Sequence, residues 1–147
     1  MTTISPEKLS DMRIKHLEMV QSVVARIAGQ GATLKNYCIT LTTAICGFAI
    51  SLQKPFVGLL ALLPITMFWL LDTQYLRIER RLRRLFDEVR SKDWGAVPTF
   101  EIALRTAPEV AFAAVLWSWS IVSFYIPLAI GVVMVVFIAG CVYGRFV

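Results

Sequence analysis

The stretch Phe56–Lys92 reads FVGLLALLPITMFWLLDTQYLRIERRLRRLFDEVRSK, and it decides the fold. Its first part, through Leu71, is apolar enough for the hydrocarbon core of a bilayer. Its second part is basic, with apolar side chains at helical spacing, so it suits water. The two parts follow one another without a break. This pattern predicts an integral membrane protein with a rigid helical stalk on one side of the membrane.

The composition agrees with a small membrane protein. Hydrophobic residues make up 57% of the 147 residues, and this length allows one compact unit and not two ordinary domains. The net charge of +5 is unevenly spread. Basic residues gather before the first apolar run (Lys8, Arg13, Lys15, Arg26, Lys35) and after the second (Arg77, Arg80, Arg81, Arg83, Arg84, Arg90, Lys92). Because lysine and arginine favour cytoplasmic loops, both segments are predicted to be cytoplasmic, which fits a helical hairpin.

We therefore expect an all-α membrane protein in four segments. Residues 1–33 form a cytoplasmic amphipathic helix that starts at Ser5-Pro6 and is loosened or broken by Gly29-Gln30-Gly31. Residues 34–72 form a transmembrane hairpin, with spans at Leu34–Leu52 and Phe56–Leu71 and an expected kink at Pro64. Residues 73–106 form the cytoplasmic basic stalk and a linker. Residues 107–147 form an interfacial part and a C-terminal transmembrane helix.

The stalk carries one apolar stripe on an otherwise charged helix. Its members recur at helical spacing: Tyr75, Ile78, Leu82, Leu85, Phe86 and Val89. Such a stripe needs a partner, and the amphipathic N-terminal helix lies on the same side of the membrane. We expect the two to pack antiparallel, forming a two-helix stalk in which acids of the first helix are available to the arginines.

The C-terminal region allows two topologies. Pro108 is expected to open a helix in which Ala111–Ser123 lies along the interface and Phe124–Val142 spans the membrane. Alternatively, two spans meet at Pro127, which requires a reversal with almost no loop residues. The first topology, with three spans in all, is favoured and places the C-terminus outside.

The inventory of catalytic groups is nearly empty. The chain has one histidine, His16, on the apolar side of the N-terminal helix, and the familiar nucleophile, phosphate-loop and zinc motifs are absent from the sequence. The three cysteines, at positions 38, 46 and 141, suit neither a metal site nor a disulfide framework. We expect no cofactor and no enzymatic activity.

A polar stripe runs along the first span. Asn36, Thr40, Thr43, Gly47 and Ser51 recur every three or four residues, so they share one side of the helix. Lipid offers no partners for hydroxyls and amides, so the stripe should face protein or water. One interpretation is helix packing, for which small polar residues are common. The other is a pore wall, which a chain of this size forms only as an oligomer.

Two charged residues stand where the spans leave the membrane. Asp72 ends the second span and is expected to reach water or Arg77. Lys35 begins the first span. Either they are solvated interface residues, or they form a gate or inner mouth of a channel.

The stalk arginines allow three interpretations. They form a positive flank that touches anionic lipid, or they pair with acids of the N-terminal helix, or they bind the phosphates of a nucleotide. The candidate ligand- or partner-binding residues are Arg77, Arg80, Arg81, Arg84 and His16.

Several short motifs resemble a family of small bacterial inner-membrane proteins found in anti-phage defence loci. They are Lys15-His16-Leu17-Glu18, Phe68-Trp69-x-Leu71-Asp72, Tyr75-Leu76, Glu79-Arg80 and Arg83. The chain is similar to the membrane effectors of nucleotide-signalling systems such as Hailong. The resemblance implies a closed homo-oligomer of the inner membrane, with a tetramer as the expected size. A neighbouring nucleotidyltransferase would make the nucleotide or oligonucleotide signal, and its binding would depolarise the membrane as an abortive-infection response.

Two functional hypotheses follow. The favoured one is a nucleotide-gated homo-oligomeric ion channel lined by the polar stripe. The alternative is a non-conducting membrane anchor or regulatory subunit whose stalk docks a cytoplasmic partner protein. The alternative predicts that charge reversal at Arg80 and Arg84 releases a partner without changing the membrane potential.

Overall fold

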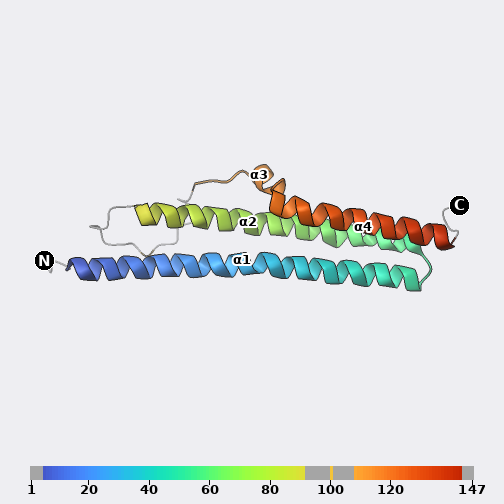
Figure 1. Cartoon of the computed structure of the whole chain (residues 1–147), viewed down its shortest axis with the longest axis horizontal. Coiled ribbons are helices and arrows are strands. Elements are labelled where there is room, and N and C mark those ends of the chain that lie inside the picture. Colours follow the sequence, from blue (N-terminus) through green and yellow to red (C-terminus); the bar gives the residue numbers. More distant parts are fainter. Residues whose placement is uncertain (1–4, 92–99, 101–107, 144–147) are drawn as a thin grey trace.

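The computed structural model describes residues 5–91, 100 and 108–143, and every regular element in them is helical. The elements are α1 (Pro6–Ser51), the 3₁₀ helix η1 (Pro55–Ala61), α2 (Leu62–Ser91), α3 (Phe112–Leu116) and α4 (Trp119–Tyr143). Figure 1 shows α1 and α2 side by side and antiparallel over most of the length of α2, with the N-terminal end of α1 extending beyond the end of α2. Helix α4 covers only the half that holds the turn between them, where the C-terminus also lies. The other half contains two helices.

Helix α1 begins where the sequence predicts, but it does not stop where expected. The hydroxyl of Ser5 accepts a hydrogen bond from the backbone N of Lys8, and Pro6 opens the helix. The expected break at Gly29-Gln30-Gly31 is wrong, because α1 continues for 46 residues, about 69 Å. Packing against α2 along this length outweighs the cost of about 1 kcal/mol for each helical glycine. No hinge therefore separates residues 1–33 from the first apolar run.

The predicted turn at Gln53–Pro55 is present, and it leads into an unexpected 3₁₀ helix. Gln53 adopts a left-handed φ of 53°, and Lys54 N bonds back to the carbonyl of Ala49. Residues Pro55–Ala61 form η1 instead of the first turns of an α-helix. Pro64 then stands in the first turn of α2, where its missing N–H has no intrahelical partner to lose. It follows the change of helix type and does not interrupt a continuous α-helix.

Two apolar clusters hold the helices together. The larger joins α1, η1, α2, α3 and α4, and contains Cys38, Ala61, Ile65, Val115, Ile121 and Tyr125 among its buried members. The smaller lies in the two-helix half, where Leu82, Leu85 and Val89 of α2 pack against Leu17, Val23, Val24 and Ile27 of α1. The apolar stripe of the basic segment is thus buried against the N-terminal half of α1, antiparallel to it.

The C-terminal region has a single long helix. Pro108 does not open it: residues 108–111 have no regular secondary structure, and the short α3 begins after Ala111, whose backbone is extended. The expected continuous helix is interrupted at Trp117 and Ser118, and α4 starts at Trp119. Pro127 lies inside α4, so the alternative of two spans meeting at this proline is wrong. The predicted linker falls largely on residues 92–99 and 101–107, outside the described residues.

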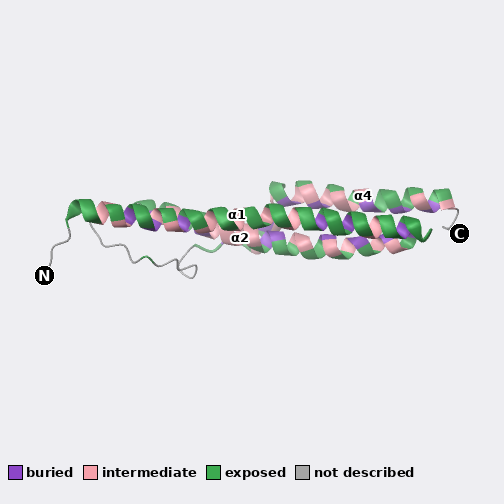
Figure 2. Ribbon diagram, turned by 90° about the horizontal axis from the view of Figure 1, so that it is seen from below, coloured by how far each residue is buried: buried purple, intermediate pink, exposed green. Residues whose placement is uncertain are grey.

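Two helical stretches among the described residues are long and apolar enough to cross a membrane, Pro55–Ser91 and Trp119–Tyr143. Helix α1, which carries the polar stripe, is not one of them, so a span at Leu34–Leu52 stays a prediction. Figure 2 shows the outer faces of the helices as mostly exposed. Many of these exposed side chains are large and apolar, including Phe48 (61% exposed), Leu63 (63%) and Phe137 (62%). Such surfaces require lipid or another protein.

Candidate functional site

A buried ion pair joins α1 and α2. Lys35 Nζ lies 3.4 Å from Oδ2 of Asp72, with the lysine side chain 25% exposed and the aspartate side chain 5% exposed. Both were predicted as inner-mouth residues, but the expected partner of Asp72 among the basic residues was Arg77, which instead binds a backbone carbonyl. Gly31 makes the approach possible, because a Cβ there would lie 3.2 Å from Oδ1 of Asp72. The glycine predicted as a helix breaker is therefore a close-packing residue.

The ion pair lines a pocket of about 280 Å³ between α1, α2 and the start of α4. Besides the pair itself, polar groups come from Tyr75, Glu79 and Ser120. Lys35 Nζ also lies 5.7 Å from the ring centroid of Phe124, within cation–π range. The pocket thus holds one cation and two carboxylates at the junction between the apolar and the basic part of α2.

Helix α4 is fixed to α2 at the same level by aromatic contacts. The hydroxyl of Tyr125, whose residue is fully buried, donates to the carbonyl of Phe68 at 3.3 Å. The ring of Trp69 stacks parallel to that of Tyr125 at a centroid distance of 6.2 Å, and Trp117 meets Trp69 edge-on at 6.4 Å. Sequence reasoning missed Tyr125 and Ser120. A tyrosine inside an apolar helix was the available signal, because a buried hydroxyl needs a partner.

The five residues of the polar stripe all lie on the outside of the protomer. Asn36, Thr40, Thr43, Gly47 and Ser51 are exposed, whereas α1 buries Cys38, Thr42 and Ala49 on its opposite side. The Thr40 hydroxyl is satisfied within the helix, since it donates to the carbonyl of Asn36 at 2.9 Å. No described residue hydrogen-bonds the side chains of Asn36, Thr43 or Ser51. Contacts within one protomer therefore do not account for the stripe.

Three of the predicted ligand-binding arginines contact the chain itself. Arg77 Nε donates to the carbonyl of Val110 at 2.8 Å, Arg80 Nη2 to Ser118 Oγ at 2.7 Å, and Arg84 Nη1 to the carbonyl of Glu109 at 3.2 Å. Spaced by three and four residues, they form one ladder along α2 that holds the segment Pro108–Ser118. We call this segment the strap. Arg81 is half-buried and does not line a described pocket.

His16 is not gathered with this ladder. It is buried in the seam between the two helices (3% exposed), and its ring lies 5.5 Å from that of Phe100. The neighbouring Arg13, also buried, donates to the carbonyl of Val89 at 3.4 Å. These contacts hold the N-terminal part of α1 against the C-terminal part of α2. His16 therefore has a packing role.

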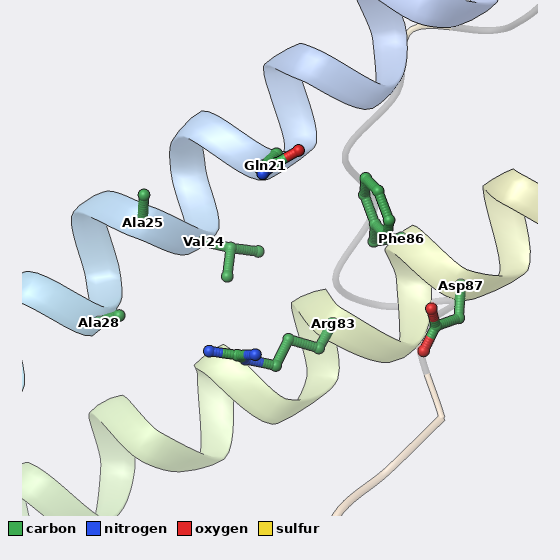
Figure 3. A pocket seen from close by; sticks show the side chains of 7 residues that line it. All are labelled: Gln21, Val24, Ala25, Ala28, Arg83, Phe86 and Asp87. Atoms are coloured by element: carbon green, nitrogen blue, oxygen red, sulfur yellow. The ribbon is translucent and has the colours of Figure 1, made fainter.

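A wider groove lies between the same two helices (Figure 3). It has a volume of about 470 Å³ and is lined by Gln21, Val24, Ala25, Ala28, Arg83, Phe86 and Asp87. Arg83 is the basic residue in it and is held by Glu79, 2.7 Å away on the preceding turn. None of the four predicted ligand-binding arginines lines this groove. Within residues 5–91, 100 and 108–143, no cluster of His, Cys, Asp or Glu is suited to a metal ion.

Three features therefore characterise the site. They are the buried Lys35–Asp72 pair, the polar face of α1, whose Asn36, Thr43 and Ser51 side chains have no described partner, and the arginine ladder that holds the strap. In comparisons with known proteins, no family model, no curated protein and no solved structure matches the chain.

Proposed function

We propose that the protein is a homo-oligomeric ion channel of the bacterial inner membrane. The observation that carries the proposal is the outward-facing polar stripe of α1, whose Asn36, Thr43 and Ser51 side chains have no described partner in the protomer. In hydrocarbon such groups are costly, so they should turn towards sister copies or water. Several copies arranged around an axis bring the stripes together as a wall.

The lengths of the helices support the proposed orientation. From Pro55 to Asp72 the chain rises about 29 Å, given 2.0 Å per residue in η1 and 1.5 Å in α2. This matches the hydrocarbon thickness of about 30 Å. The Lys35–Asp72 pair then lies at the inner edge of the hydrocarbon. The two-helix half, with most of the basic residues, lies in the cytoplasm, and α4 ends on the other side.

The continuity of α1 supports a gating mechanism. One helix carries both the seam with the basic part of α2 and the polar stripe, with no break at Gly29–Gly31. A rotation of the cytoplasmic half is therefore transmitted to the stripe without a hinge. The Lys35–Asp72 pair ties α1 to α2 between these two parts, so it acts as a latch of the closed state.

For the signal, we propose a nucleotide made by a neighbouring nucleotidyltransferase, so that the channel acts as an abortive-infection effector against phage. The sequence resemblance supports this part of the proposal. According to this proposal, the nucleotide acts on the cytoplasmic half and breaks the Lys35–Asp72 pair.

The first experiment combines stoichiometry with ion flux. The purified full-length protein in nanodiscs should form a closed ring by mass photometry, and liposomes containing it should leak ions. Thr43→Leu and Asn36→Leu should each reduce the ion flux severalfold, because each replaces a polar side chain of the proposed pore wall with a larger, apolar one. Phe48→Leu, on a lipid-facing side of the same helix, should leave the flux unchanged.

A single protomer per particle, or equal flux in all variants, would remove the pore assignment. In that case the non-conducting anchor becomes the better hypothesis. Its own signature is a cytoplasmic protein that copurifies with the wild type and is lost on charge reversal at Arg80 and Arg84, with the membrane potential unchanged.

A further inference from the structure

Arg77 and Arg80 carry charges that no described carboxylate neutralises. Their acceptors, the carbonyl of Val110 and the hydroxyl of Ser118, are both neutral. The ion pairs among described residues join Lys35 to Asp72 and Arg83 to Glu79. A guanidinium has five N–H donors in a planar fork, so each arginine keeps donors for a further acceptor. Both side chains are only partly buried, so an acceptor has access to them.

The backbone of Arg77 lies at the outer edge of the lipid headgroup layer, and that of Arg80 lies a few ångströms beyond it. If Asp72 marks the inner edge of the hydrocarbon, the helical rise places the Cα of Arg77 about 8 Å and that of Arg80 about 12 Å beyond it. The headgroup layer is about 5–8 Å thick on each side. Long arginine side chains reach back towards the membrane. Arg80 does so here, because its guanidinium bonds Ser118, which directly follows Trp117.

Two exposed tryptophans flank the acceptor of Arg80. Trp117 is 67% exposed and Trp119 is 84% exposed, while Trp117 still touches Trp69 of α2. Tryptophan prefers the interface between hydrocarbon and headgroups. The serine bonded by Arg80 therefore lies in the chain between two residues suited to that layer. Arg84, about 18 Å beyond Asp72, holds the same strap but lies in water.

We propose that Arg77, Arg80, Trp117 and Trp119 form a binding site for the phosphate headgroup of an anionic phospholipid in the cytoplasmic leaflet. Charge complementarity supports this occupant: guanidinium groups bind phosphate oxygens bidentately, and that leaflet is anionic. The tryptophans supply the apolar contact with the upper acyl chain. The inference rests on the membrane orientation of the proposed function, and not on conduction.

The test uses the tryptophans as reporters in vesicles. The full-length protein is reconstituted in phosphatidylcholine mixed with phosphatidylglycerol, and the acyl chains of one lipid at a time are brominated to quench tryptophan fluorescence. The ratio of the two quenching curves gives the preference for the anionic lipid around the protein. Wild type should prefer phosphatidylglycerol, and each of Arg77→Gln and Arg80→Gln should lower the preference by about fivefold. Arg80→Lys keeps the charge and should retain part of it.

Two controls separate the lipid site from other causes. Arg84→Gln removes the same charge and another strap contact, and Arg83→Gln removes a charge on another face; both should keep the preference within twofold. An unchanged preference in Arg77→Gln/Arg80→Gln, or an equal loss in Arg84→Gln, overturns the proposal. So does abolition by millimolar inorganic phosphate but not by chloride of equal ionic strength, which would indicate a soluble phosphate ligand. The readout needs no ion flux, so the result stands even if the channel assignment fails.

Discussion

Removing Lys35 and removing Asp72 should lower the free energy of unfolding by different amounts, and the two effects should be strongly coupled. Lys35→Met leaves the Asp72 carboxylate, whose side chain is 5% exposed, without its cation. Asp72→Asn leaves the lysine, which is 25% exposed and has a flexible stem that can carry its ammonium to water. Asparagine also keeps the shape that Gly31 accommodates. The lysine variant should therefore be the less stable of the two.

The magnitudes follow from the burial of each partner. Stranding a buried charge costs about 3–5 kcal/mol, so Lys35→Met should lower the free energy of unfolding by about 3 kcal/mol. Asp72→Asn should cost about 1 kcal/mol, because the remaining charge can be hydrated. The double variant strands no charge and should cost about 2 kcal/mol, which leaves a coupling energy of about 2 kcal/mol. If the pair latches the closed channel, the same energy shifts the gating equilibrium about 30-fold.

The assay is a double-mutant cycle of unfolding free energies, measured by SDS titration in mixed micelles. The control cycle uses Glu79→Gln and Arg83→Met, an ion pair one turn apart whose arginine side chain is 63% exposed. That cycle should give a coupling below about 0.5 kcal/mol. The reasoning is refuted if the Lys35–Asp72 coupling is equally small, or if Asp72→Asn is the more damaging single change.

Further predictions concern packing. Gly58→Ala should cost about 2 kcal/mol, because its Cβ would lie 2.7 Å from Cγ2 of Val136. Gly47→Ala, whose Cβ would meet no atom within 4 Å, should instead raise the protomer's stability in the same titration by up to about 1 kcal/mol, the helix-propensity difference between glycine and alanine. Leu82→Ala should cost about 3 kcal/mol, since this side chain is fully buried in the smaller cluster. Hydrogen exchange should then accelerate in the two-helix half and not in the three-helix half. Tyr125→Phe should cost about 1 kcal/mol in the SDS titration by removing the hydrogen bond that the buried tyrosine hydroxyl donates to the carbonyl of Phe68.

Composition and periodicity identified the helices because these properties are local. The apolar run before Asp72 and the stripe from Tyr75 to Val89 follow directly from side-chain spacing. The wrong prediction of a helix break at Gly29–Gly31 arose because the outcome there depends on tertiary contacts and not on local sequence. Helix propensity treats a glycine as unfavourable in a helix, whereas here the missing Cβ of Gly31 leaves room for the Asp72 carboxylate, which would lie 3.2 Å from it.

The polar stripe shows what a spacing pattern predicts and what it leaves to the fold. Spacing placed its five residues on one side of a helix, and the fold determined which side. That side is opposite to Cys38, Thr42 and Ala49, so the stripe is left for another copy or for water. The partner of Asp72 was misjudged because Arg77 is nearer in the chain, whereas antiparallel packing brings Lys35 closer in space.

By itself, the sequence determined an all-helical chain with apolar helices at Phe56–Leu71 and Phe124–Val142 that suit a membrane, and a basic amphipathic segment, since each depends on residues within a few turns. The third span that it predicts, Leu34–Leu52, stays a prediction. Only the tertiary structure decided that Lys35 meets Asp72, that the arginine ladder holds the strap and that α4 continues as one helix through Pro127. The ion pair and the ladder join residues 25 to 38 positions apart. Their geometry is set by the register of the whole bundle, which no local pattern encodes.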